Sequence, residues 1–380
     1  MVVPHSLQLF AATPPGLEDV TAQELRTLGT DGIKPVAGGV EFEGDVSTLY
    51  SVNLWSRTAQ RILVRLDDFY VVHLAKLHKK LQHIPWESYL DPTRPIEVKA
   101  TCRKSRIYHS AAAAERGARA IQERLGLQNL PEFGAGAPRE DSEANGVVLR
   151  FERDHCTVSL DSSGAHLHRR GYRIGRYDAP IRENLAAALL LACGFNGETD
   201  FWDPMCGSGT FPIEAAMMAA NIAPGMNRPF AFMQWPGFDK PLWASLLRKA
   251  RESIRQPESV IGGSDINPSA VSMSRAHAKA AGVSEQTRFD TVAVDALRIP
   301  AKGGLVLANP PYGKRIGNRK QLNRLYRQLG AMTSRHGSAW QLGVVTNEPG
   351  FATATGLDIH PSGLPFPNGG VRVRLYRTAS

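Results

Sequence analysis

Hydrophobic positions at the start of the chain alternate between the two-residue period of strands and the longer period of helices. The elements that they predict are a strand (6–13), a helix that begins at a proline (14–29), a strand (38–44) and a helix (45–55). In the second strand, Val40 and Phe42 share one face, which marks it as half-buried. This strand–helix–strand–helix order predicts a small ferredoxin-like α+β domain over residues 1–65.

The same rhythm repeats over residues 66–163 and predicts a second α+β domain. Its predicted elements are a strand (61–66), a basic helix (73–90), a strand (95–105), a helix (110–126) and a hairpin (146–164). Apolar side chains alternate along both arms of the hairpin, at Val147, Leu149 and Phe151 and then at Val158 and Leu160. The loop 131–146 before the hairpin is rich in glycine, proline and charge, and predicts a mobile insertion.

Residues 164–180 predict a linker between folded domains. Arg169, Arg170 and Arg173 alternate there with glycines and with Tyr172 and Tyr177. A solvated connector is one interpretation of this segment. Arginines interleaved with aromatic side chains also suit phosphate contact and base stacking, and we favour this second interpretation.

From Ile181 to residue 380 the pattern changes to helices that alternate with short, strongly apolar strands. These strands are predicted at residues 199–204, 259–266, 287–294, 304–311 and 340–347. Such alternation predicts a doubly wound, largely parallel α/β sheet. In these sheets, ligands bind beyond the carboxyl ends of the strands. The residues that follow each strand are therefore the candidates for chemistry.

The composition narrows the class of protein. The formal net charge of +9 and the pI of about 9.5 fit either a polyanionic partner or a basic enzyme surface. The four cysteines form no CxxC pair, so we expect neither a zinc site nor any other metal, and no disulfide framework. Neither a signal peptide nor an apolar run long enough to span a membrane is recognisable, and we expect a cytoplasmic protein.

The first strand end of the α/β region carries the segment DPMCGSGT. Asp203 ends the strand, Gly207 and Gly209 make a tight turn, and a helix begins directly afterwards. Glycines allow a ligand to approach the backbone, and a helix N-terminus favours an anionic group. The segment lacks the GK[ST] of a P-loop and the third glycine of the dinucleotide motif, so a nucleotide-like ligand and a structural turn both remain open.

Two further strand ends carry acidic residues. Asp265, in GGSDIN, could accept hydrogen bonds from both ribose hydroxyls of an adenosine, or it could cap the helix that starts near Asn267. It lies about 60 residues after Asp203 rather than the usual ~20, and segment 223–243 is the predicted insertion that accounts for the difference. Asp295, in AVDALRIP, could bind an adenine amino group.

The fourth strand ends in Asn309-Pro310-Pro311-Tyr312. Transfer of a methyl group from a sulfonium needs an in-line approach and an activated amine. The Asn309 side-chain oxygen and the Pro310 carbonyl could accept the hydrogens of an aromatic-ring amine and stabilise its developing charge. Pro311 stiffens the backbone, and Tyr312 could stack on a base extruded from its helix. The alternative is a proline-rich turn with a packing tyrosine.

The segments DPMCGSGT, SDIN and NPPYG, in this order, resemble class I S-adenosylmethionine-dependent methyltransferases of the amino-group type. The N-terminal region resembles a ferredoxin-like domain followed by a THUMP domain, an RNA-binding module. Segments EAAMMAANIAPGMNRPFAFMQWPGF, LDSSGAHLHRRGYR and NGGVRVRLYR are similar to the RlmL-type large-subunit ribosomal RNA methyltransferases. Some RlmL proteins carry a second methyltransferase domain, whereas the present sequence ends at the first.

The resemblance implies a Rossmann-like domain over residues 181–380, with a seven-stranded, mostly parallel sheet that binds S-adenosylmethionine. The residues that it assigns to the cofactor are Glu183, Asp203, Met205, Gly207, Gly209, Thr210, Asp265, Ile266, Asp295, Ala296 and Asn309. It assigns the target amine to Asn309, Pro310, Pro311 and Tyr312. For RNA binding it suggests Arg103, Lys104 and Arg106 in the THUMP-like domain, and Arg169, Arg170 and Arg173 in the linker.

The activity that this family implies is methylation of the exocyclic N2 amine of a guanine in 23S ribosomal RNA, by a protein that we expect to be a monomer. Guanine methylation in transfer RNA is the nearest alternative. The NPPY motif alone would also fit a DNA adenine methylase or a methylase of protein glutamine amides, and the N-terminal domains argue against both. A non-catalytic RNA-binding factor is the alternative from a different class.

Overall fold

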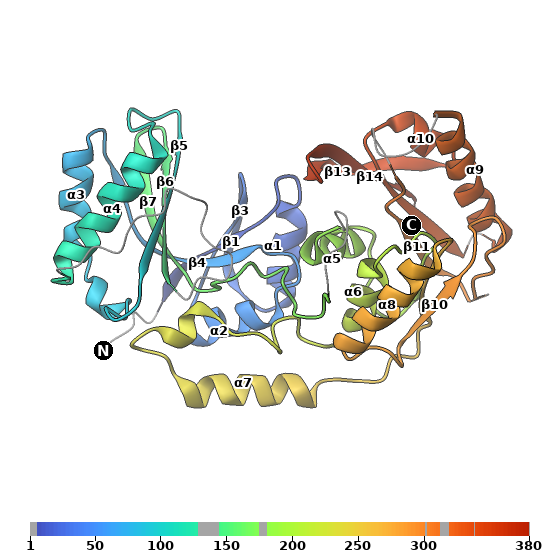
Figure 1. Cartoon of the computed structure of the whole chain (residues 1–380), viewed down its shortest axis with the longest axis horizontal. Coiled ribbons are helices and arrows are strands. Elements are labelled where there is room, and N and C mark those ends of the chain that lie inside the picture. Colours follow the sequence, from blue (N-terminus) through green and yellow to red (C-terminus); the bar gives the residue numbers. More distant parts are fainter. Residues whose placement is uncertain are drawn as a thin grey trace.

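The computed structural model describes residues 6–127, 144–174, 181–300, 302–311, 319–337 and 339–379. Tyr312, the end of the linker (175–180) and most of the 131–146 loop lie outside these ranges, so the predictions for them stay predictions. The described residues form two seven-stranded sheets, one in each half of the chain. The two halves lie beside each other as separate lobes (Figure 1).

The N-terminal sheet has the strand order β2-β3-β1-β4-β7-β6-β5. Its strands are β1 (Leu7–Ala12), β2 (Asp31–Val36), β3 (Gly39–Gly44), β4 (Arg61–Tyr70), β5 (Ile96–Arg103), β6 (Asn145–Glu152) and β7 (His155–Asp161). The helices between them are α1 (Glu18–Thr27), α2 (Val46–Trp55), α3 (Leu74–His83) and α4 (Ser110–Arg124), with a short 3₁₀ turn, η1 (Trp86–Ser88). The predicted hairpin is confirmed as the antiparallel pair β6–β7.

The first half of this sheet has the βαββαβ order of a ferredoxin-like fold, with all its strand pairs antiparallel. Strand β2 was not predicted. It is an edge strand that carries Pro35, and its residues are exposed or half-buried, so no alternation of apolar side chains marks it in the sequence.

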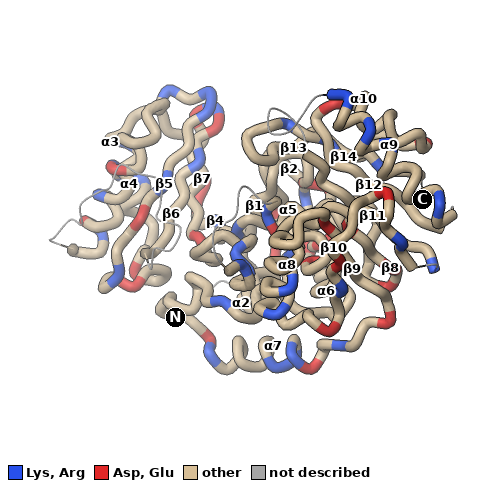
Figure 2. The backbone as a smooth tube through the Cα atoms, turned by 45° about the vertical axis from the view of Figure 1, so that its right-hand side comes forward, with Lys and Arg blue, Asp and Glu red and all other residues tan. Residues whose placement is uncertain are grey.

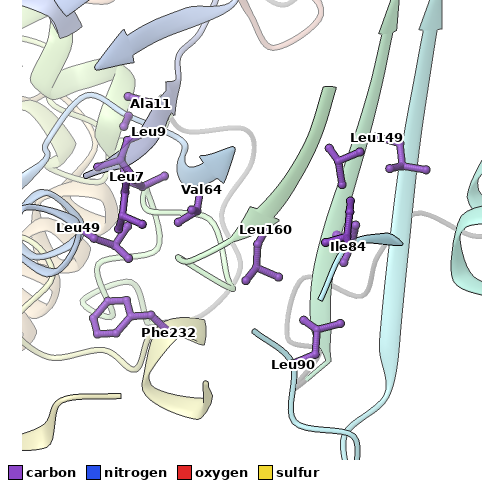
Figure 3. Packing of buried hydrophobic residues seen from close by; sticks show 14 of the residues in the cluster. Leu7, Leu9, Ala11, Leu49, Val64, Ile84, Leu90, Leu149, Leu160 and Phe232 are labelled. Carbon is purple, nitrogen blue, oxygen red and sulfur yellow. The ribbon is translucent and has the colours of Figure 1, made fainter. Parts of the chain in front are cut away.

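The predicted domain boundary at residues 65/66 falls inside β4, and the structure places no break there. β4 pairs with β1 through residues 61–64, and it pairs with β7 from Leu63 to Tyr70. One long strand therefore belongs to both halves of the N-terminal sheet. Apolar side chains on both sides of β4, such as Leu9 and Leu49 on one side and Leu149 on the other, belong to the same core (Figure 3).

The second sheet has the order β10-β9-β8-β11-β12-β14-β13. Its strands are β8 (Asp200–Asp203), β9 (Ile261–Asp265), β10 (Thr287–Thr291), β11 (Gly304–Ala308), β12 (Trp340–Thr346), β13 (Ile359–Asn368) and β14 (Val371–Thr378). The first five are parallel, and β14 is antiparallel to both β12 and β13. This is the mostly parallel, Rossmann-like sheet that the sequence predicts.

Helices cover both faces of this sheet. They are α5 (Glu183–Ala192), α6 (Thr210–Ala219), α8 (Pro268–Ala280), α9 (Arg319–Arg335) and α10 (Pro349–Thr353). The remaining helix of this half, α7 (Lys240–Glu252), packs against the N-terminal core instead. Side chains of α5, α6 and α8 share one apolar cluster with Leu305 and Leu307 of β11. Side chains of α9 and α10 share another with Val306 and Ala308. This alternation along β11 is that of a strand buried on both faces.

The predicted insertion forms a second link between the two halves. It contains a 3₁₀ turn, η2 (Ala231–Gln234), and leads into α7, which runs below α2 (Figure 1). Phe232 of η2 stacks on Tyr50 of α2 with ring centroids 4.3 Å apart, and Trp243 of α7 packs edge-on against Phe232. The insertion thus buries its aromatic side chains in the N-terminal core, although in sequence it belongs to the second half.

Candidate active site

The carboxyl ends of β9, β8 and β11 lie side by side in the second sheet. After β8 the chain crosses to β9 on one side of β8, whereas β11 later pairs with the other side of β8. The strand order therefore reverses between β8 and β11. Val306 of β11 pairs with Trp202 of β8, so the residues that follow both strands leave the sheet together. Ligands of open α/β sheets bind at such a point.

The turn after β8 has the close-approach geometry that the sequence predicts. Oδ1 of Asp203 accepts a hydrogen bond from the Met205 backbone N–H at 2.9 Å. Gly207 and Gly209 have φ values of +52° and +81°, and Thr210 begins α6 directly afterwards. At Gly209, a Cβ atom would lie 2.9 Å from Cβ of Ser274, so the turn has room for glycine alone.

Asp265 is bound to this glycine turn. Its Oδ2 accepts a hydrogen bond from the Gly207 N–H at 3.0 Å, and its Oδ1 accepts one from the Asn267 N–H at 2.9 Å. The side chain of the next residue, Ile266, is 75% exposed. The ends of β8 and β9, which lie about 60 residues apart in the sequence, therefore meet at one place. There the carboxylate of Asp265 lies next to the exposed apolar side chain of Ile266.

The carboxyl group of Asp203 is almost fully buried. Burial, with a smaller contribution from the charge of Asp265, raises the pKa of Asp203 from its ordinary value to about 8. The Met205 N–H opposes this rise only in part. A buried carboxyl without a cation among the described residues is suited to a cationic ligand group, which would favour its ionised form.

Asn309 follows the last residue of β11. Its Oδ1 atom is buried and has no hydrogen-bond partner among the residues that the structure describes. Pro310 is buried and Pro311 is half-buried. An orphaned buried acceptor costs free energy unless a ligand satisfies it, so this oxygen is a candidate acceptor for an N–H group.

Asp295 and Ala296 are exposed on the loop after β10. One Asp295 carboxylate oxygen accepts a hydrogen bond from Gln328 Nε2 at 3.0 Å, and its backbone carbonyl accepts one from Arg335. Both partners come from α9, and the sequence analysis did not identify either of them.

Glu183 is buried at the start of α5 and is held by Arg173. The Arg173 Nε–Glu183 Oε1 distance is 2.5 Å, and Arg173 Nη2 also donates to the Ile181 carbonyl and to Thr210 Oγ1. Burial raises the pKa of Glu183, and the charge of Arg173 opposes this. Arg173 thus ties the linker to α5 and to the first residue of α6. The RNA-binding role predicted for Arg173 does not fit a guanidinium engaged in this way.

The surroundings of Arg170 contradict its predicted RNA-binding role more clearly. Its side chain is buried, its guanidinium donates to the backbone carbonyls of Leu167 and Arg57, and it lies 3.5 Å from Oε2 of Glu214 in α6. Because no solvent-facing nitrogen is left for a phosphate, Arg170 is a structural residue. The linker up to residue 174 is correspondingly packed, with Leu167 and Tyr172 buried, and Arg169 is half-buried.

Two polar residues of α8 that the sequence analysis missed support the glycine turn. Ser274 Oγ donates to the Gly207 carbonyl at 2.8 Å. The buried ring of His277 places Nδ1 3.0 Å from the Ser208 carbonyl and Nε2 3.2 Å from the Ile174 carbonyl. Their spacing of three residues puts both on one helix face, but nothing in the sequence alone says that this face meets the turn.

Arg103 ends β5, Lys104 and Arg106 follow it before α4, and all three are exposed. Arg106 pairs with Asp154 of the β6–β7 turn at 3.7 Å, and Tyr108 beside them is 70% exposed. Figure 2 shows basic segments at the upper end of the lobe formed by α3, α4 and β5–β7.

Among the described residues, His, Cys, Asp and Glu side chains form no group of three or more that could bind a metal ion. Within the same ranges, none of the helices combines the length and the apolar character that crossing a bilayer requires.

Comparison with protein-family models gives two matches. The RMKL-like methyltransferase domain matches residues 170–360, and the RlmL ferredoxin-like domain matches residues 8–63.

Several curated proteins resemble most of the chain. A Synechocystis sp. protein whose name proposes an RNA methyltransferase is 34% identical over 368 residues, 94% of each chain. Proteins named ribosomal RNA large subunit methyltransferase K/L, from Syntrophotalea carbinolica and Methylococcus capsulatus, are 36% and 35% identical over 93% of this chain. The chain spans about half the length of these two relatives, 51% and 49%.

Solved structures show the same architecture over the full chain. SMU.472, a protein proposed to be a methyltransferase and crystallised with S-adenosylhomocysteine (SAH), superposes with a TM-score of 0.86 at 29% identity, over 100% of this chain and 99% of that one. A Listeria monocytogenes protein described as a predicted N6-adenine-specific DNA methylase gives 0.86 at 31% identity, over 99% and 96%. TrmN from Thermus thermophilus shares the fold, with a TM-score of 0.71 at 19% identity over 98% of both chains.

Proposed function

The chain belongs to the RlmL family of S-adenosylmethionine-dependent RNA methyltransferases, and on this basis we propose that it methylates the exocyclic N2 amine of a guanine in 23S ribosomal RNA. The single observation that carries the proposal is the buried, unpartnered Oδ1 of Asn309 at the end of β11, beside the glycine turn. Its place in the fold suits an acceptor for the amine of a base.

The residues around this point fit the cofactor. We assign the methionine end to Asp203, Met205 and the turn from Gly207 to Thr210, because a buried carboxyl and the N-terminus of α6 suit an amino acid moiety. Asp265 lies at the ribose position, with Ile266 as an apolar face beside it. Asp295 and Ala296 take the adenine end. When bound, S-adenosylmethionine supplies a methyl group activated by its positive sulfonium.

The chain's own residues would then act on the nucleophile. Oδ1 of Asn309 and the carbonyl of Pro310 accept hydrogen bonds from the two N–H groups of the guanine amine. These hydrogen bonds draw the nitrogen lone pair out of conjugation with the ring. Pro311 stiffens this acceptor pair, and the stacking of Tyr312 on the base stays a prediction from the sequence. Glu183, which Arg173 links to Thr210 at the start of α6, keeps its predicted place at the methionine end.

We assign the capture of RNA to the exposed group Arg103, Lys104 and Arg106 and to Arg169. The first three stand at one end of the N-terminal lobe, where the exposed ring of Tyr108 adds a stacking surface. The N-terminal half would thus act as the THUMP-like RNA-binding region. Transfer RNA is the second candidate substrate, which the same geometry accommodates.

Labelling tests the proposal directly. RNA from cells that lack the protein, incubated with the purified chain and tritiated S-adenosylmethionine, should accept label in the large-subunit ribosomal RNA fraction. Nuclease digestion followed by mass spectrometry should then identify N2-methylguanosine. Label in the transfer RNA fraction would move the substrate to the alternative, and label that enters DNA or protein alone would refute RNA methylation.

A further inference from the structure

Helix α9 follows the Asn309 loop in the chain and is strongly basic. Its seventeen residues, Arg319–Arg335, contain five Lys or Arg and no Asp or Glu. Such a charge is unbalanced within the helix itself, because none of the i, i+4 ion pairs that usually accompany a solvated helix can form.

Helix α9 is amphipathic, with an apolar buried face and a basic exposed face. Leu322, Tyr326 and Leu329 are buried against β11 and β12, whereas Arg324 and Arg327 are exposed. Spacings of three and four residues repeat one face of a helix, so Arg324 and Arg327 point to the same side, one turn apart. Lys320 is exposed on the same side, one turn before Arg324.

The arginines at the two ends of α9 have partners within the protein, whereas the two in its middle have none among the described residues. Arg319 pairs with Glu348 at 3.3 Å, and Arg335 donates to the Asp295 carbonyl. For Arg324 and Arg327, the described part of the chain offers no ion pair or hydrogen bond. Their charges therefore remain available to an external anion.

The end contacts also fix where this basic face lies. Arg319, the first residue of α9, pairs with Glu348, which follows β12, so the start of the helix lies at the carboxyl-end rim of the sheet. The helix then runs back toward the start of β12 at Trp340, with Asp295 of the loop after β10 beside it. Gln328, between Arg324 and Arg335, holds the Asp295 side chain. Figure 1 shows α9 at the end of the molecule opposite α3 and α4.

We propose that the outer face of α9, carried by Arg324 and Arg327, binds the phosphate backbone of the substrate RNA beside the active site. This inference rests on the proposed RNA methylation and adds a second contact region to it. RNA held by the N-terminal lobe alone would be attached at one side of the rim. A second phosphate contact on the far side would fix the strand on both sides of the extruded base.

The test is a double substitution, Arg324→Gln with Arg327→Gln, in the full chain. A matched control, Arg248→Gln with Arg251→Gln, removes the same charge from the exposed side of α7, where Arg248 already has Glu252 as an i, i+4 partner. Affinity for a large-subunit ribosomal RNA fragment is measured between 0.05 and 0.3 M salt, alongside methylation at saturating RNA and binding of SAH.

Removal of two phosphate contacts should weaken RNA binding by about tenfold at 0.1 M salt and lower the slope of log K against log salt by about 1.5. Turnover at saturating RNA and SAH affinity should stay within about twofold of the unmodified chain, and the α7 control should match it throughout. An unchanged affinity and slope in the α9 variant, with the unmodified chain active on RNA, would overturn the inference alone. Failure of the unmodified chain to methylate RNA would instead refute the proposed function.

Discussion

One oxygen atom bears most of the chemical argument. Oδ1 of Asn309 is buried without a partner among the described residues, at a point where backbone from two strand ends converges. Other buried side-chain atoms of the described residues, such as Asn184 Oδ1, also have no partner. What distinguishes the Asn309 oxygen is its place at the carboxyl-end rim of an α/β sheet, where ligands bind.

The Asn309 side chain should matter for turnover and not for cofactor binding. Asn309→Ala removes an acceptor whose hydrogen bond strengthens as the amine gains positive charge, so we expect kcat to fall by roughly two orders of magnitude or more. Calorimetry with SAH should give a Kd close to that of the unmodified chain. An equal loss in both quantities would place Asn309 in the cofactor site instead.

Asp203 should make cofactor binding depend on pH. Its pKa is raised to about 8 by burial, so the carboxyl is largely protonated at neutral pH in the free protein, whereas a cationic cofactor favours the carboxylate. Affinity for S-adenosylmethionine should therefore rise as the pH increases from 6 to about 8 and level off above it. Asp203→Asn should bind more weakly and lose this dependence.

The same group affects folding with the opposite sign. A carboxyl whose pKa is higher in the folded than in the unfolded state favours folding while it is protonated, and this contribution is lost as the pH rises from about 4 through 8. Asp203→Asn should thus be more stable to urea than the unmodified chain at pH 9. Equal urea midpoints at pH 9 would argue against a raised pKa.

At the scale of elements, Gly209 in the turn between β8 and α6 has a matched control in Gly194, which follows α5. Gly209 and Gly194 share a φ of +81°, but a Cβ at Gly194 would meet nothing within 4 Å, whereas one at Gly209 would meet Ser274 of α8. Gly194→Ala should cost only the left-handed backbone penalty, roughly 1 kcal/mol of unfolding free energy.

Gly209→Ala should cost more than this and should also weaken SAH binding by at least tenfold, because α8 must move away from the turn. Thermal unfolding and calorimetry on both variants measure the difference. Equal behaviour of the two variants would show that the contact with Ser274 does not shape the turn.

Elements with a strong periodic pattern could be predicted from the sequence, and those defined by tertiary contacts could not. The parallel strands of the second half, buried on both faces, read as short apolar runs, and the glycine turn and Asn309 follow two of them. Strand β2 and most of β13 are edge strands with largely exposed or half-buried residues, so no alternation marks them. The side chains that support the glycine turn, Ser274 and His277, become apparent only once helices are packed.

The linker arginines show that the sequence alone does not separate an RNA-binding arginine from a structural one. Arg169, Arg170 and Arg173 stand among tyrosines and glycines, a pattern typical of RNA contact. Two of them instead hold buried carboxylates, Glu214 and Glu183. Both roles require the same guanidinium, and the carboxylates that decide between them lie far away in the sequence or on another element.

At the scale of the whole molecule, these buried charges join the N-terminal half of the chain to the methyltransferase domain. Arg57 of the N-terminal half donates to the Ile222 carbonyl beyond the end of α6, and Arg170 and Tyr172 reach Glu214 in the middle of the same helix. The linker and the N-terminal half therefore both contact α6, the helix that follows the glycine turn. This contact therefore fixes how the two halves sit against each other.

Arg170 should therefore prove a residue of stability. Arg170→Met leaves Glu214 charged in the interior, which costs roughly 3 kcal/mol or more of unfolding free energy. The double variant Arg170→Met with Glu214→Gln removes the stranded charge and keeps an acceptor for Tyr172, so it should regain more than half of that loss. Urea unfolding of the three chains measures the difference. The salt slope of RNA binding should be the same in all of them, since no phosphate contact is lost; a lower slope in Arg170→Met without any loss of stability would return Arg170 to the RNA surface.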